Sequence, residues 1–326
     1  MKKKLHIVTI TLILLLILLF EKCTSSKSKK FNFIGAVAVW SLSDLNDETY
    51  PKSNLKTYGD VPIISLKGDE ARASLERGGD AKVLQFGKGW LNAGQGTNEE
   101  LNLTGKNVSI LVRIKANEII DGYVPIINKA GNDQSLAYAI SIVKYNEDVY
   151  IESMIGSDDI AGSHLLKYKI PTEEYYIWHD ILFRFNGKKS ELFVDGQLRD
   201  DEITVGEIRD WNRKPFLIGA IYKKPFGYTE ATSDQVEAKF NGLIDHVVLW
   251  NRYISDDEVK VVSGVKELKD GRPKYYDEKY RPQFHFSAKK NWINDPNGLF
   301  FYKGIYHLFF QYMPPHRPGA YKDWGH

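Results

Sequence analysis

The sequence predicts an all-β protein built around an antiparallel jelly-roll β-sandwich. From about residue 31 to residue 264, short stretches of alternating apolar and polar residues recur, and glycine and asparagine separate them. The same region has almost no helical periodicity. Many short strands joined by turns are typical of sandwiches. Roughly 230 residues is a comfortable size for one such domain.

Individual strands are predicted from local patterns. Residues 108–115 alternate in polarity, which indicates a strand with one apolar face. Asp195-Gly196 predicts a hairpin after residues 190–194, because glycine tolerates positive φ. Further strands are predicted over 137–143, 148–155, 181–185, 216–218 and 243–250.

The composition excludes several classes of protein. Apolar residues make up 43% of the 326 residues and charged residues 26%, which excludes intrinsic disorder, collagen and coiled coil as the main architecture. Lys and Arg number 44 against 42 Asp and Glu, so there is no electrostatic case for a nucleic-acid partner. The single cysteine excludes intramolecular disulfides.

Residues 1–22 are predicted to be an export signal. Three lysines at positions 2–4 precede an apolar run over 7–20. At about 1.5 Å per residue the run spans roughly 21 Å, which is short for a bilayer core of about 30 Å. The length therefore favours a signal peptide over a short membrane anchor, which stays the alternative.

The cysteine lies just after this run. The placement of Cys23 resembles a bacterial lipoprotein signal, although Glu21 and Lys22 stand where small residues are expected. A lipidated and an unmodified Cys23 both stay open. Residues 23–30 are predicted to be a polar tether. We expect an exported protein at the cell surface, in the periplasm or outside the cell, which meets the membrane only through its signal or a lipid anchor.

Motifs in the long middle region resemble a laminin-G-like, concanavalin A-like jelly roll, and we place this domain at 31–264. The resemblance implies carbohydrate binding, so a polysaccharide is one expected partner. The motifs occur in the order Ala38-Val39-Trp40-Ser41, Trp178-His179-Asp180-Ile181, Leu192-Phe193-Val194-Asp195-Gly196-Gln197 and Phe240-Asn241-Gly242-Leu243-Ile244-Asp245-His246-Val247.

Candidate ligand residues in this domain are few. Some jelly rolls bind calcium, and Asp195 and Asp245 are the candidate calcium ligands in this domain. The residues favour the alternative, in which Asp195 forms a turn and Asp245 hydrogen-bonds at a strand end. No other metal or cofactor is expected. Trp90 and Trp211 lie in glycine-rich or polar contexts and are the better candidates for stacking on sugars. The core is the expected place for Trp40, Trp178 and Trp250.

A linker over 265–280 is predicted, because residues 266–274 are charged and include Gly271 and Pro273. The motif Trp292-Ile293-Asn294-Asp295-Pro296-Asn297-Gly298 follows. Pro296 disfavours the α region for Asp295, and Pro-Asn-Gly has strong turn chemistry. Asp295 is thus predicted at a strand end just before a turn, where scaffolds often display catalytic side chains. Taken alone, the motif fits a turn without chemistry.

The neighbouring motifs change this interpretation. Residues 281–286, 306–312 and Trp324-Gly325-His326 flank it, and together 281–326 resemble the opening of glycoside hydrolase family 32, the invertase, levanase and inulinase family. The resemblance implies the first, truncated blade of a five-bladed β-propeller and a fructan or sucrose substrate. It implies that Asp295 is the nucleophile. In the same way, Trp292, Asn294, Gln311 and Trp324 are implied to bind the substrate.

The C-terminal segment also departs from the family pattern. Gly319 stands where the family has a pocket tryptophan, and Tyr321 is an aromatic substitute. The resemblance also implies an acid/base Glu in a Glu-Cys motif and a transition-state-stabilising Asp in an Arg-Asp-Pro motif, and neither motif follows Asp295. We therefore expect an N-terminal fragment of a retaining hydrolase that is inactive alone. The rival hypotheses are an exported carbohydrate-binding jelly roll with a vestigial hydrolase tail, and an inactive scaffold.

Overall fold

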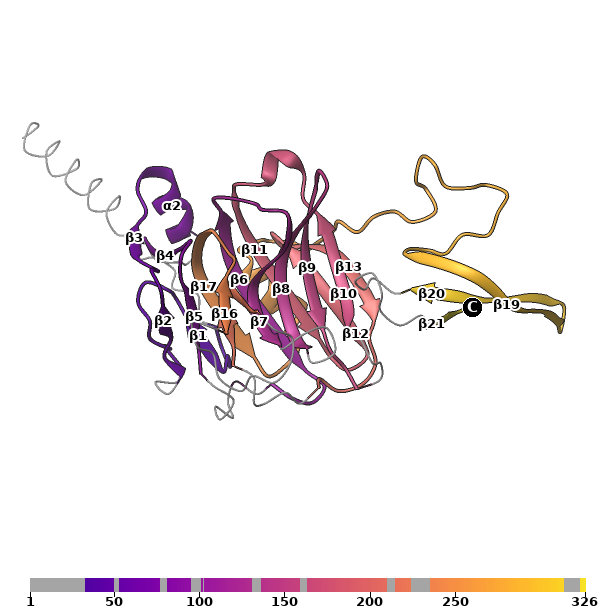
Figure 1. Cartoon of the computed structure of the whole chain (residues 1–326), viewed down its shortest axis with the longest axis horizontal. Coiled ribbons are helices and arrows are strands. Elements are labelled where there is room, and N and C mark those ends of the chain that lie inside the picture. The colour runs from indigo at the N-terminus through magenta and orange to yellow at the C-terminus, as the bar shows by residue number, and fades with distance from the viewer. Residues whose placement is uncertain are drawn as a thin grey trace, which may run out of the picture.

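The computed structural model describes residues 33–49, 53–76, 81–94, 101, 103–130, 136–158, 163–209, 215–223, 235–313 and 323–326. Two large sheets pack face to face, and a separate three-stranded sheet follows near the C-terminus (Figure 1). The predicted all-β class is confirmed. The predicted signal, Cys23 and the tether lie outside the described residues. None of the helices in the described ranges has the length and apolarity needed to cross a membrane.

The first sheet has β6 (Val108–Ala116) near its centre, between β11 (Trp178–Phe185) and β17 (Gly242–Trp250). Its neighbours are far apart in sequence, as jelly-roll connections require. The rest of the sheet comprises β12 (Lys189–Val194), β13 (Gln197–Ile203) and β18 (Lys269–Asp270) beyond β11, and β4 (Lys82–Phe86), β3 (Ile63–Ser65) and β1 (Ala38–Trp40) beside or beyond β17.

The second sheet is a run of antiparallel neighbours that ends on short strands. Its spatial order is β10 (His164–Lys169), β9 (Asp148–Ile155), β8 (Leu136–Tyr145), β7 (Gly122–Ala130), β14 (Leu217–Ile218), β5 (Trp90–Asn92) and β2 (Lys56–Tyr58). β15 (Ala220–Tyr222) and β16 (Val236–Ala238) form a two-stranded sheet of their own, and β15 lies beside β7.

The core fills the space between the two large sheets. Period-2 alternation sends Ile110 and Val112 of β6 inward, where they share one buried cluster with Ile140 and Ile142 of β8. Trp40 belongs to this cluster and donates its Nε1 proton to the Ser53 carbonyl at 2.9 Å. Trp40 is fully buried and Trp250 is 1% exposed, as expected of core residues, whereas Trp178 is only half-buried.

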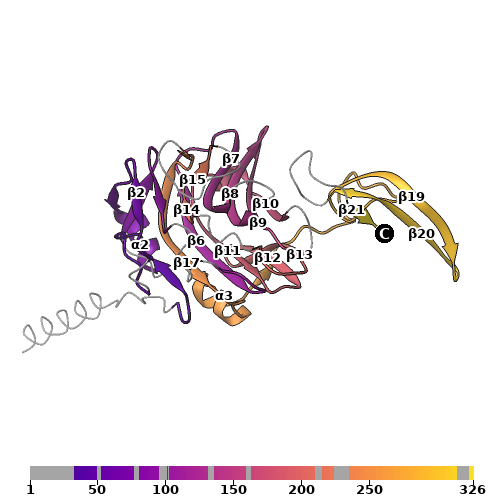
Figure 2. The same ribbon diagram turned by 60° about the horizontal axis from the view of Figure 1, so that its bottom comes forward.

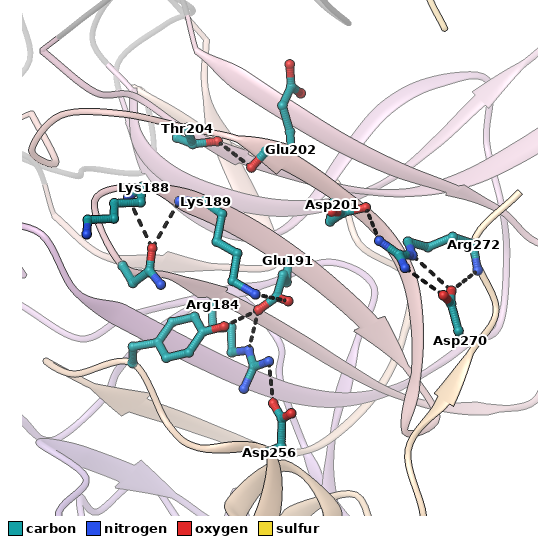
Figure 3. A network of polar contacts seen from close by, with 12 residues as sticks. Arg184, Lys188, Lys189, Glu191, Asp201, Glu202, Thr204, Asp256, Asp270 and Arg272 are labelled. Carbon is teal, nitrogen blue, oxygen red and sulfur yellow. Dashed lines mark hydrogen bonds and ion pairs between the residues drawn. The ribbon is translucent and has the colours of Figure 1, made fainter. Parts of the chain in front are cut away.

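Among the described residues, two α-helices and one 3₁₀ helix interrupt the strands: α2 (Gly68–Glu76), η3 (Thr172–Glu174) and α3 (Asp256–Val262). They are too short for helical periodicity to show in the sequence. The Ser255/Glu258 capping box, with its Ser-x-x-Glu spacing, is the signal that would have found α3. Arg184 of β11 donates to Glu191 at 2.7 Å and to Asp256 at 2.6 Å, and so joins α3 to the outer face of the first sheet (Figure 3).

The segment predicted as a linker is partly built into the sandwich. β18 pairs in parallel with β13, with Gln197 opposite Lys269 and Leu198 opposite Asp270. The chain then runs to β19 (Trp292–Tyr302), β20 (Ile305–Met313) and β21 (Asp323–Gly325), which form the separate antiparallel sheet drawn in yellow in Figure 2. Lys303 and Gly304, both at positive φ, form the tight turn between β19 and β20.

Candidate active site

The β19–β20 hairpin brings most of the predicted site residues together. Ile293 is opposite Tyr312 and Pro296 is opposite Phe310, so Asn294 and Asp295 share one partner position, that of Gln311. Two residues facing one is the definition of a β-bulge, which bends a strand and redirects its side chains. The bulge therefore presents Asn294 and Asp295 next to Gln311.

A cross-strand row of polar and aromatic residues follows from this register. Asn294 donates from Nδ2 to Oε1 of Gln311 at 3.3 Å. On the other side of β20, Gln311 is opposite Trp324 of β21. Three of the five predicted site residues thus lie in one row across three strands, and Asp295 lies beside it.

The position of Asp295 corrects one detail of the prediction. β19 continues from Trp292 to Tyr302, so Asp295 lies at a bulge within a strand and not at a strand end before a turn. A second register shift lies between Asn297 and Phe300, and Gly298 within it has φ of 63°. The turn-forming residues Pro296, Asn297 and Gly298 therefore do not end the strand. One bulge lies just before Pro296 and another lies just after Asn297, and β19 stays paired with β20 on both sides.

The row lies on an exposed surface. Asn294 and Asp295 are exposed, and the exposed fractions of Trp292 and Trp324 are 45% and 71%. Phe309 contacts Trp324 with ring centroids 6.4 Å apart and extends the aromatic face. These side chains can stack on and hydrogen-bond a sugar ring, but they do not enclose it.

The approach to β19 is fixed by cations that a sequence pattern does not single out. Arg281 donates to the Ala288 carbonyl at 2.7 Å and also pairs with Glu278. Lys290 donates to the Asp200 carboxylate at 3.2 Å and to the Asp201 carbonyl at 3.1 Å. Lys290, two residues before the strand that carries Asp295, is thereby tied to β13 of the sandwich. No spacing signal identifies the partners of Lys290, because they lie about 90 residues away in sequence.

The tryptophan candidates of the sandwich have different outcomes. The prediction that Trp90 is available for sugar stacking is wrong: it is 4% exposed and stacks on Tyr58 with ring centroids 4.2 Å apart. Its glycine-rich context reflects close backbone packing, since a Cβ on Gly89 would lie 2.7 Å from the Tyr58 carbonyl oxygen. Trp211 lies outside the described residues.

Asp195 behaves as a turn residue. It has φ of 54°, and its carboxylate accepts from the Asp180 backbone N–H at 2.9 Å. Its other oxygen lies 2.8 Å from Nδ1 of His179. Burial lowers the pKa of His179, but the Asp195 carboxylate, together with Glu174, more than offsets this, so the pKa lies above its usual value.

Asp245 is fully buried, and a cation lies beside it. Its Oδ2 lies 3.6 Å from Nε of Arg113 and 3.4 Å from Nδ1 of His246. Arg113 also lies over the Trp178 ring, 5.1 Å from its centroid. Across the ranges that the structure covers, no three His, Cys, Asp or Glu side chains converge as a metal site would require.

Sequence comparison assigns the sandwich to a superfamily. Residues 92–260, more than half of the chain, match the family model described as the concanavalin A-like lectin/glucanases superfamily. The chain belongs to that superfamily. A second model, the glycosyl hydrolases family 32 N-terminal domain, matches residues 285–326, which hold all five predicted site residues.

Curated relatives match the same C-terminal region. The levanase of Bacillus subtilis is 56% identical over 52 residues, which are 16% of this chain and 8% of the levanase. The extracellular exo-inulinase of Aspergillus niger is 57% identical over 51 residues, 16% of this chain and 10% of the inulinase. An insoluble β-fructofuranosidase isoenzyme of Oryza sativa is 47% identical over 60 residues, 18% of this chain and 10% of that enzyme. The chain thus spans about a tenth of the length of these relatives.

Solved structures resemble the sandwich at low sequence identity. Domain 4 of a GH43 extracellular arabinanase from Geobacillus stearothermophilus is 14% identical, with a TM-score of 0.48 over 70% of this chain and 98% of that chain. The binding domain of botulinum neurotoxin serotype G is 13% identical, with a TM-score of 0.48 over 74% of this chain and 55% of that chain.

Proposed function

We propose that the protein is a glycoside hydrolase of β-fructofuranosides, with fructan or sucrose as substrate. The observation that carries the proposal is the bulge that sets Asn294 and Asp295 beside Gln311, within a segment that matches the family 32 model. Relatives named for levan, inulin and β-fructofuranoside hydrolysis support the substrate class.

In the proposed reaction, the Asp295 carboxylate attacks the anomeric carbon and forms a fructosyl-enzyme. A second carboxyl group protonates the leaving oxygen and then removes a proton from the attacking water, so the configuration is retained. Asn294 and Gln311 hydrogen-bond the fructosyl hydroxyls. Trp292 and Trp324 supply its aromatic walls. None of these steps needs a metal ion or a cofactor.

The 326-residue chain by itself is proposed to be inactive. Retaining chemistry needs two carboxyl groups about 5–5.5 Å apart in a site that excludes bulk water. The exposure of Asp295 and Trp324 supports the idea that further chain must enclose this surface and supply the acid.

The test compares this chain with a product extended through any open reading frame beyond codon 326. Fructose release from levan, inulin and sucrose is the readout. We expect release only from the extended product, with a loss on the order of 10⁴-fold for Asp295→Asn. Asp277→Asn, an exposed acid in the linker, is the matched control. Turnover by the 326-residue chain that is lost in Asp295→Asn would contradict the proposed inactivity.

Export and surface attachment are part of the proposal. The basic and apolar pattern of residues 1–22 supports export, and a relative is named as extracellular. Lipidation is proposed at Cys23. Incorporation of labelled fatty acid that Cys23→Ser abolishes is the expected result, and unlabelled protein would refute it.

A second candidate function is carbohydrate binding without hydrolysis. It is favoured by the superfamily match over the sandwich, which exceeds half of the chain. A stop codon at position 327, together with saturable polysaccharide binding that Asp295→Asn leaves unchanged, would favour this candidate. An open frame encoding Arg-Asp-Pro and Glu-Cys motifs would favour the hydrolase.

A further inference from the structure

A cavity of about 410 Å³ lies where the sandwich meets the chain that leads to β19. It lies between the edge of the first sheet and the segment beyond β18, and its lining includes neither Asn294 nor Gln311. Its polar and aromatic lining comes from Asp201 of β13, Asp270 of β18, and Arg272, Lys274, Tyr275 and Lys289.

The polar side of this cavity is held in a fixed geometry. Arg272 donates from Nη1 to Asp201 at 2.9 Å, and from Nη2 and Nε to Asp270 at 2.6 Å and 2.9 Å (Figure 3). These hydrogen bonds lower the pKa of Asp270 to about 2. The Asp270 carboxylate therefore stays an acceptor, and the oxygens of both aspartates have lone pairs beyond those that Arg272 uses. Two oriented carboxylates beside a guanidinium suit the adjacent hydroxyls of a sugar.

The cavity lining also includes one aromatic residue, Tyr275. The ring of Tyr275 is half-buried, and Nζ of Lys289 lies 5.2 Å from its centroid. Stacking on an aromatic face is one way in which an otherwise polar ligand gains apolar contact. The lining holds two carboxylates against three cations, one of which is already paired twice, so the cavity has no strong preference for an anion.

We infer that this cavity is an accessory binding site for a neutral carbohydrate chain, with Tyr275 as its stacking platform and the Asp201–Arg272–Asp270 group as its hydroxyl-binding side. The identity of the chain as fructan rests on the proposed function. Lys289 precedes Asp295 by six residues, so the cavity lies within about 22 Å of the proposed nucleophile. A polymer bound in this cavity would stay near the β19–β20 hairpin between successive binding events at the proposed active site.

The linker offers a matched control. Tyr280 is 85% exposed, and Lys279 lies over its ring at the same 5.2 Å, but neither residue lines the cavity. Tyr280→Ala thus removes an equivalent pair from the same segment. Tyr275→Phe keeps the ring and removes only the hydroxyl.

The experiment is isothermal titration of the 326-residue chain with a linear fructo-pentasaccharide and, separately, with maltopentaose. We expect fructo-pentasaccharide binding that Tyr275→Ala weakens at least tenfold and that Tyr275→Phe and Tyr280→Ala change less than twofold. Unchanged thermal unfolding of Tyr275→Ala establishes that the variant is folded. A second folded variant, Lys289→Ala, is expected to weaken binding to a smaller degree.

Two results would overturn the inference: no binding of either sugar, or equal binding by Tyr275→Ala and Tyr280→Ala. Tyr275-dependent binding of maltopentaose alone would support the site and refute its assignment to fructan. Because the readout is binding and not fructose release, failure of Asp295 as nucleophile is detected separately by the hydrolysis assay.

Discussion

Nη1 of Arg113 lies 2.9 Å from Oδ1 of Asp180, and both side chains are 3% exposed. The two residues are directly opposite each other on β6 and β11. Asp245 lies beside the same guanidinium, at 3.6 Å from its Nε. A buried cation with two buried carboxylates therefore sits on the outer face of the first sheet, covered by Trp178.

We expect Arg113→Met to lower the free energy of unfolding by about 3–5 kcal/mol, because it leaves two buried carboxylates without their cation. Lys115→Met is the control two residues along β6; its partner Glu70 is half-exposed, so the cost should stay below about 1 kcal/mol. Urea unfolding measures both. Equal effects of the two variants would show that the buried group contributes no more than a surface pair.

Helix α3 depends on its capping box. The Ser255 side chain accepts from the Glu258 backbone N–H, and Glu258 reaches back to Ser255. We expect Ser255→Ala to cost about 1 kcal/mol and Ser255→Thr much less. Thermal unfolding is the measurement. A loss in Ser255→Thr as large as that in Ser255→Ala would contradict the capping role.

Acid should weaken the same helix. Hydrogen bonds from Arg252, followed by those from Ser255, outweigh desolvation and lower the pKa of Glu258 to about 2, against 4.5 in the unfolded chain. The stabilisation is therefore present above pH 4.5 and is lost as the pH falls toward 2. Glu258→Gln should flatten this part of the stability profile. A profile identical to that of the parent chain would refute the assignment.

Glu202 should give the opposite pH dependence. Burial, then repulsion from nearby carboxylates, raises its pKa to about 7 despite the opposing effect of Lys290. One carboxyl oxygen has no hydrogen-bond partner within the described part of the chain. The charged and titratable groups that face it are Asp200, Asp201, Lys290, Tyr275 and Tyr312.

The folded state favours the protonated form of Glu202. Its stability contribution is full below pH 4.5, the unfolded value, and is lost as the pH rises through about 7. We expect Glu202→Gln to raise the unfolding temperature at pH 8 and to leave it nearly unchanged at pH 4.5. Glu207→Gln, on an exposed side chain, is the control. An unaltered melting profile in Glu202→Gln would contradict this account.

Gln311 should matter for catalysis in an active, extended product. Its amide accepts from Asn294 and lies in the row that we propose binds the fructosyl unit. Gln311→Ala is expected to lower kcat/KM for sucrose roughly tenfold, the value of about one hydrogen bond. Gln283→Ala, an exposed glutamine in the same segment, should leave kcat/KM unchanged. Equal rates in the two variants would remove Gln311 from the site.

Local pattern predicted much of this molecule. The alternation over 108–115 and the Asp195-Gly196 turn both correspond to observed elements, because period and turn chemistry are local properties. The prediction for Trp90 is wrong, because its burial depends on Tyr58 and Gly89, which its own sequence context does not reveal. The bulge at Asn294 and Asp295 could not be predicted either, because the register depends on which residue of β20 faces Pro296.

The short parallel pairing of β18 with β13 has a consequence for how the sandwich behaves when it is cut. β13 is otherwise a seven-residue edge strand, and unpaired edge strands are templates for self-association. Cleavage after residue 264 would strip Lys269 and Asp270 from this edge and expose part of its backbone ladder. A soluble form of the isolated sandwich therefore needs to extend past Arg272. Proteolysis at the start of the linker, near residue 265, should produce a fragment that aggregates.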